Sequence, residues 1–136
     1  MLRLSCALLA SLLLAGPALG QAAKPVKSPD GKLRAEAAGK AVSIFDAATG
    51  RKLITVAAHT KDVTVMVFSP DGKALFSGDT GGVVLRLDVR TGRLEWKSGG
   101  KSAVKTLSFD PAGKAVTAGL ADGTSLKLDP ATGKRK

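Results

Sequence analysis

The feature that most constrains the fold of this chain is a five-residue tag, Ser-Pro-Asp-Gly-Lys, that recurs at a fixed spacing. The tag occupies residues 28–32 and returns 41 residues later at 69–73, and an altered form, Asp-Pro-Ala-Gly-Lys, follows after another 41 residues at 110–114. A second tag, Asp-Xaa-Xaa-Thr-Gly followed by Arg or Lys, keeps nearly the same period and begins at Asp46, Asp88 and Asp129. A repeat of about forty residues indicates consecutive, similar structural units.

Both tags have the composition of turns, since Pro fixes one backbone angle, Asp can bond its own backbone and Gly accepts a positive φ. The segments between them alternate apolar and polar residues and are rich in β-branched and aromatic side chains, as in Val63–Phe68. This pattern predicts short antiparallel strands. Four strands in about forty residues make one blade of a β-propeller. The sequence therefore predicts an all-β fold, an incomplete β-propeller with repeats at about 28–58, 59–99 and 100–136.

The repeats are unequal in the number of strands that we expect from them. The first begins almost at its turn, after a short linker over residues 21–27, and the third ends before an outer strand. The expected strands lie at 33–37, 41–45 and 52–57, then at 63–68, 74–77, 83–87 and 93–97, and finally at 103–109, 114–117 and 124–128.

The stretch from Ala58-His59 through the tag at 69–73 to Ser77-Gly78 resembles a WD repeat. In that family a Gly-His pair opens the repeat, a Ser-Pro-Asp-Gly turn and a Ser-Gly pair follow, and a Trp-Asp pair closes it. This sequence departs from the pattern, because Ala58 replaces the Gly and Leu87 stands in the Trp position. Residues 88–96 also look like the repeat of quinoprotein propellers.

The WD-repeat resemblance implies a hydrogen-bonded tetrad of His, Ser or Thr, Asp and Trp within each blade. In the middle repeat His59 and Ser77 match it, and Gly81 stands where we expect the turn Asp. In the last repeat Asp122 matches the turn Asp, whereas the His and Ser positions hold Gly and Ala. We therefore expect structural roles for His59, Ser77 and Asp122 and a fold that depends mainly on apolar packing.

The first twenty residues have the pattern of a secretory signal peptide: a charged start at Arg3, an apolar run and a small-residue end at Gly20. We expect this signal helix to be cleaved after Gly20, with no transmembrane span left. Cys6, the only cysteine, precedes the apolar run rather than following it, so we do not expect lipid attachment. The predicted location is periplasmic or secreted, in a bacterium.

The number of repeats raises the question of closure, because closed propellers use about four to eight blades and this chain holds about three. We expect an unclosed arc to leave apolar sheet faces and bare strand edges in water. Three alternatives follow: self-association completes the ring, the sequence is a fragment of a longer propeller, or three sheets stand alone.

Catalytic chemistry has few candidates in this composition. His59 is the only histidine, and a triad with Asp62 and Ser77 would lack a nucleophile on a strained turn. The carboxylates mostly lie in turn tags, and neither a metal-ligand spacing nor a phosphate-binding loop is present. We therefore predict no enzyme, no cofactor and no catalytic, cofactor-binding or metal-binding residue.

The charge of the chain is strongly positive, with 21 Lys and Arg against 11 Asp and Glu and a formal net charge of +10. Such a charge favours acidic partners, and on an exported protein it could favour an anionic envelope surface. Nucleic acid is not expected, because aromatic side chains for base stacking are scarce. The alternative is that Lys residues simply solvate strands and protect sheet edges.

These observations predict an exported, non-catalytic scaffold of WD-repeat-like blades that binds another protein or itself. Two alternatives stay open. One is a fragment of a larger propeller enzyme, quinoprotein-like or hydrolytic, and the other is a basic binder of anionic envelope surfaces.

Overall fold

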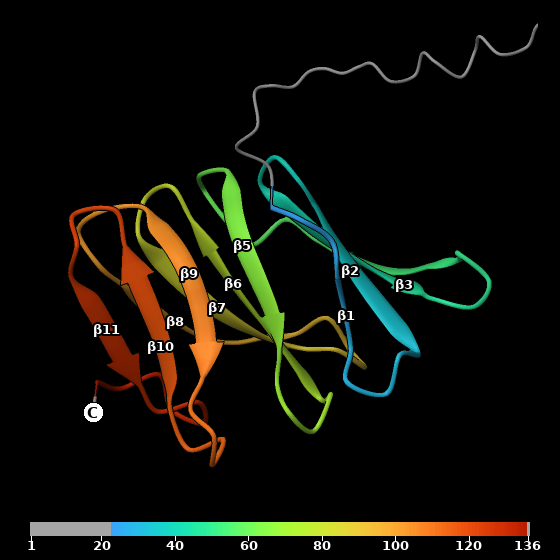
Figure 1. The fold of residues 1–136 in the computed structure, drawn as a ribbon. Helices are drawn as coiled ribbons and strands as arrows, with labels where there is room; N and C mark the ends of the chain where they lie inside the picture. The colour runs from blue at the N-terminus through green and yellow to red at the C-terminus, as the bar shows by residue number, and fades with distance from the viewer. Residues whose placement is uncertain (1–22, 136) are drawn as a thin grey trace, which may run out of the picture.

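The structure is a computed structural model that describes residues 23–135. Within this range eleven strands form three antiparallel sheets that stand side by side (Figure 1). The first sheet contains β1 (Val26–Lys27), β2 (Leu33–Ala38), β3 (Ala41–Asp46) and β4 (Lys52–Val56). The second contains β5 (Val63–Phe68), β6 (Ala74–Asp79), β7 (Val83–Asp88) and β8 (Leu94–Gly99), and the third contains β9 (Val104–Phe109), β10 (Val116–Leu120) and β11 (Ser125–Leu128).

Each sheet pairs its strands in chain order, and the first strands of the three sheets are neighbours. β5 contacts both β1 and β9, so the sheets meet along their inner strands and spread apart toward their outer ones (Figure 1). This is the arrangement of consecutive propeller blades. The predicted all-β fold with three blade-like sheets is confirmed.

The predictions for the N-terminal segment concern a signal peptide and a linker. The predicted signal peptide, residues 1–20, lies outside the described residues. Part of the predicted linker is a strand, because Val26 and Lys27 pair with Ala35 and Arg34 to form the short β1. Across residues 23–135 there is no helix with the length and hydropathy that a membrane crossing requires.

Most strand limits agree with the sequence to within two residues, and the largest difference is at β10, which ends at Leu120, three residues later than predicted. β5 has the predicted bounds, β6 runs two residues further to Asp79, and β10 starts at Val116, two residues later than predicted. In the third sheet a single bridge between Leu128 and Arg135 follows β11.

The first tag forms its turn through hydrogen bonds from two side chains, a Ser hydroxyl and an Asp carboxylate. In the second repeat the Ser69 hydroxyl donates to Asp71 and accepts from the Ala74 N–H at 3.1 Å, while Asp71 accepts from the Lys73 N–H at 2.9 Å. Gly72 follows at φ 73°, which glycine adopts without strain. The first repeat has the same contacts from Ser28 and Asp30.

The altered third tag makes a similar turn with one side chain. Asp110 stands where the other repeats have Ser, and its carboxylate accepts from the Lys114 N–H at 2.7 Å and the Ala115 N–H at 3.1 Å. The loss of the Ser and of the central Asp is therefore compensated by a longer acidic side chain.

Two apolar cores hold the sheets together, one at each junction. The first, between the first and second sheets, includes Ala35, Val42, Ile44, Val63, Met66, Phe68, Leu75 and Leu87. The second, between the second and third sheets, includes Phe76, Val84, Val104, Leu107, Val116, Leu126 and Leu128. Every residue of β6 is buried, because the middle sheet is covered on both faces.

The outward faces of the two end sheets are polar, which corrects the expectation that an unclosed arc leaves apolar faces in water. Side chains alternate between the faces of a strand, so the neighbours of the core residues point outward. On the third sheet these are Thr106, Ser108, Thr117, Ser125 and Lys127, and on the first they include Arg34, Glu36, Ser43 and Thr55. Phe45, the aromatic side chain on this face, lies beneath Arg34, whose guanidinium carbon is 4.8 Å from the ring centroid.

Candidate functional site

A buried hydrogen-bonded network lies inside the second sheet. His59 precedes β5, and its Nδ1 is 2.8 Å from an oxygen of Asp79, while its Nε2 is 2.7 Å from the hydroxyl of Ser77. The side chains of His59 and Asp79 are fully buried, and so is Ser77. The second Asp79 oxygen accepts from the N–H groups of Gly81 at 2.9 Å and Val83 at 3.0 Å.

The network corrects the position that the sequence suggested for the turn carboxylate. Asp79 supplies it, whereas Gly81 donates its N–H to that same carboxylate. The prediction missed Asp79 because it ended the strand at Ser77, while β6 continues through Asp79 and delivers its side chain to the face that carries Ser77. Asp62, the acid considered beside His59 from the sequence, is exposed and is not the acid bound to this histidine.

A Ser-His-Asp constellation resembles that of a hydrolase, but its surroundings here do not allow that chemistry. A nucleophile must reach substrate from an exposed turn, whereas Ser77 lies in the middle of β6 with no exposed surface. The network instead ties the segment before β5 to the β6–β7 turn, and it satisfies three buried polar side chains that would otherwise destabilise the fold.

Asp122, the predicted turn Asp of the last repeat, has a different environment. It is exposed, and its carboxylate accepts from the backbone N–H of Thr124 at 2.9 Å and from that residue's hydroxyl at 2.6 Å. These hydrogen bonds lower the pKa of Asp122 below its ordinary value, the hydroxyl contributing most. Asp122 therefore stabilises a local turn and is not brought near His59 or Ser77.

Among residues 23–135 no group of three or more His, Cys, Asp or Glu side chains could hold a metal ion. The acidic side chains there are mostly distributed among the turns.

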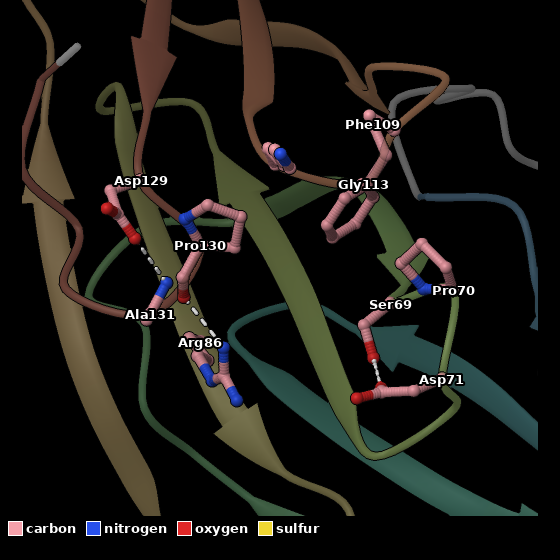
Figure 2. A pocket seen from close by; sticks show the side chains of 11 residues that line it. Ser69, Pro70, Asp71, Arg86, Phe109, Gly113, Asp129, Pro130 and Ala131 are labelled. Atoms are coloured by element: carbon pink, nitrogen blue, oxygen red, sulfur yellow. Dashed lines mark hydrogen bonds between the residues drawn. The ribbon is translucent and has the colours of Figure 1, made fainter.

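A cleft of about 540 Å³ opens between the second and third sheets, at the end where the tags lie. Figure 2 shows its two sides: Ser69, Pro70 and Asp71 from the β5–β6 turn face Asp129, Pro130 and Ala131 from the segment after β11. Phe109 is the last residue of β9, Gly113 lies in the altered tag at 110–114, and Arg86 reaches in from β7 (Figure 2). The volume of the cleft is in the range of ligand-binding clefts, about 300–1,000 Å³.

Arg86 is the cation at the base of this cleft and is held in place by three contacts. Its Nη1 donates to the carbonyl of Pro130 at 2.7 Å, and its Nε donates to Glu95 at 2.7 Å. Its guanidinium carbon also lies 5.7 Å from the centroid of the buried Phe76 ring. The side chain keeps 24% of its surface exposed, so it is oriented by protein groups and still reaches solvent.

Asp71 is an acidic group on the opposite side of the cleft, and its carboxylate is hydrogen-bonded within its own turn. The hydrogen bond from the Ser69 hydroxyl, followed by that from the Lys73 N–H, lowers the pKa of Asp71 below its ordinary value, and Arg86 contributes to the same direction. Asp129 likewise accepts from the N–H of Ala131 at 2.8 Å.

Residues 50–85 match the family model described as WD domain, G-beta repeat. Over these residues the chain is similar to a WD40 repeat. The match extends from just before β4 into β7, so the WD40 repeat includes His59, Ser77 and Asp79. No curated protein matches the chain.

The WD40 match and the cleft concern different parts of the molecule. Most of the cleft, including Phe109 and Pro130, lies beyond the matched WD40 residues. Sequence reasoning missed the cleft because its residues come from turns that are far apart in the chain. The available signal was the second tag, in which Pro130 stands where the WD40 repeat's own tag has Val89.

Proposed function

We propose that this chain is a non-catalytic scaffold that binds another protein through its WD40-type blades. The observation that supports it best is the burial of the His59, Ser77 and Asp79 network: the groups most suited to catalysis are consumed in holding the WD40 repeat together. WD40 repeats generally serve protein interactions, and the turns of this chain offer a cleft of suitable size.

The test is reversible cross-linking of the tagged full chain in its own cells, followed by binding measurements with each purified candidate. Saturable binding to at least one protein, lost when the chain is unfolded, is the expected result. Turnover of ester, peptide or alcohol substrates by the purified chain, abolished by Ser77→Ala, would contradict the proposal.

We propose that the binding partner is a different protein and not a second copy of this chain stacked on an end sheet. Stacking would remove from water the Arg34–Glu36 ion pair, 2.8 Å long, at one end or the Lys127 ammonium at the other, and burying charged groups is costly even when they are paired. Analytical ultracentrifugation of the purified chain should therefore show a monomer at micromolar concentration, whereas a closed dimer would contradict this part.

We also propose that the chain is exported by its N-terminal signal and acts in the periplasm or outside the cell. The pattern of residues 1–20 supports this. N-terminal sequencing of the protein recovered from the periplasmic fraction should begin at Gln21. An intact N-terminus in the cytosolic fraction would contradict it.

The high positive charge supports one further candidate, binding to an anionic envelope surface. Retention on immobilised lipopolysaccharide should then weaken steeply with salt, because such contacts are screened. Retention that does not respond to salt would exclude this candidate.

A further inference from the structure

The repeat provides a comparison for the cleft, since the junction between the first and second sheets is built from equivalent positions. The turns meet in the same way at both junctions: a Cβ on Gly72 would lie 3.8 Å from Pro29, and a Cβ on Gly113 would lie 3.5 Å from Pro70. The strands also correspond, because Ile44 pairs with Ala35 as Arg86 pairs with Phe76. Differences between the junctions therefore come from side chains.

The first junction is filled with apolar side chains where the second is open. Ile44 and Val89 belong to the first core and are 1% and 7% exposed. Their counterparts are Arg86 and Pro130, which line the cleft. Phe109 is similarly half-buried, whereas its counterpart Phe68 is buried.

Pro130 removes one hydrogen bond that the equivalent loops of the first two repeats make. In the first two repeats the residue after the tag's Asp donates its N–H back to the Lys carbonyl of the preceding tag, from Ala47 to Lys32 at 2.9 Å and from Val89 to Lys73 at 3.1 Å. Proline has no N–H and cannot make this bond. The Pro130 carbonyl instead accepts from Arg86 and from the Trp96 Nε1–H at 2.9 Å.

Two carboxylates, Asp71 and Asp129, and two cations, Arg86 and Lys114, line the cleft, and the group that can receive a further carboxylate is Arg86. Asp71 and Asp129 are bound to N–H groups of their own turns. Arg86 and Lys114 line the same space, and the bonds of Arg86 to Glu95 and Pro130 use two of the five N–H groups that a guanidinium carries. A carboxylate can accept two parallel N–H bonds from such a fork.

Much of the remaining lining is apolar and comes from turns. Pro70, Phe109, Ala112, Pro130 and Ala131 contribute it. Prolines and an aromatic ring suit the side chains of an extended peptide. A nucleic acid would need a row of phosphate contacts and several stacking rings, and this lining supplies one ring.

We propose that the cleft between the second and third sheets binds an extended, acidic peptide segment of a partner protein, with Arg86 receiving a carboxylate side chain. This rests on the proposed scaffold function and names the surface that performs it. The chain's net charge of +10 would attract the same acidic segment over longer distances.

The test selects peptides of about a dozen random residues, displayed on phage, against the immobilised full chain. Enriched peptides should contain Asp or Glu, and Arg86→Met should weaken their binding by about tenfold or more, since it removes a charge-assisted bond but keeps the side-chain stem. Lys127→Met is the matched control, because Lys127 pairs with Thr117 in the third sheet as Arg86 pairs with Phe76, but lies outside the cleft. It should change the affinity by less than about twofold.

A second variant separates binding from folding. Pro130→Val restores the residue type and the N–H found at Val89, so the cleft should close and binding should weaken although Arg86 is unchanged. Circular dichroism melts must show that Arg86→Met and Pro130→Val stay folded. Trp96 still donates to the carbonyl of residue 130 in Arg86→Met, and Glu95 is 35% exposed and can be hydrated.

Three outcomes would overturn the proposal. The first is that no peptide is enriched. The second is that enriched peptides bind folded Arg86→Met as tightly as the parent chain. The third is that heparin displaces the peptides equally well from the parent chain and from Arg86→Met. None of them would remove the scaffold proposal, because a partner captured by cross-linking could bind elsewhere on the blades.

Discussion

Removing the carboxyl group of Asp79 should destabilise the fold more than any other single truncation of an acidic side chain in the described part of the chain. Asp79 is fully buried and accepts three hydrogen bonds, from His59 at 2.8 Å, Gly81 at 2.9 Å and Val83 at 3.0 Å. Asp79→Ala leaves all three donors without this partner, and the imidazole is out of reach of water. The expected loss in the free energy of unfolding is about 3–5 kcal/mol.

Asp79→Asn should cost less and so identifies the source of the loss. The amide oxygen can still accept from Gly81 and Val83, and the amide NH2 can donate to His59 if the imidazole carries its proton on Nε2, which then donates to Ser77. The expected loss is about 1–2 kcal/mol, for one changed hydrogen bond.

Urea titrations followed by the fluorescence of Trp96, the single tryptophan, would measure both values. Trp96 lies 5.7 Å from Phe76, so its signal reports on the second sheet. Asp122→Ala is the control: its carboxylate is exposed and bonded to Thr124 within its own turn, so the midpoint should move far less than in Asp79→Ala. If Asp79→Ala shifted the midpoint no more than Asp122→Ala, the network would not be what holds the WD40 repeat together.

The turns yield two further predictions. Ser69→Ala removes the largest cause of the lowered pKa of Asp71, so an NMR titration should show this pKa rising toward its ordinary value. A lowered pKa stabilises the fold above the unfolded pKa and loses this effect as the pH falls through the folded one, so this variant should lose stability at neutral pH more than in acid. Gly133→Ala should destabilise by about 1–3 kcal/mol, because φ is 77° and a Cβ would lie 2.5 Å from the Trp96 ring. Gly50→Ala, at φ 75° with nothing within 4 Å, should carry only the backbone part of this cost.

The strands of the fold could be predicted from the sequence because each repeat carries two tags of turn-forming residues. The tags fix where strands end, and Val63–Phe68 is a short run, rich in β-branched residues and bounded by turn residues, which indicates a strand with the bounds that β5 has. β6 was predicted too short, because Gly78 weakens the pattern just before the functionally important Asp79.

The site was harder to predict because it depends on contacts between residues that are far apart in the chain. His59 and Asp79 are twenty residues apart, and Arg86 and Pro130 are 44 apart. Periodicity says which residues are equivalent but not which of them touch across a junction. The two cleft-forming changes, Arg86 for Ile44 and Pro130 for Val89, are visible in the sequence only after the sheets have been superimposed in register.

The same comparison explains how three sheets can stand together without closing a ring. Four apolar positions on the second sheet, Val65, Val67, Phe76 and Val84, pack into the second core. One repeat later the corresponding positions are Thr106, Ser108, Thr117 and Ser125, which keep the size and β-preference needed for a strand but add hydroxyl groups that remain hydrated. The apolar driving force for adding a further sheet is therefore much smaller at this face than at the junction inside the molecule. Polar outer faces limit further stacking in repeat proteins generally, and this supports the proposal that a partner binds at the turn cleft rather than on a sheet face.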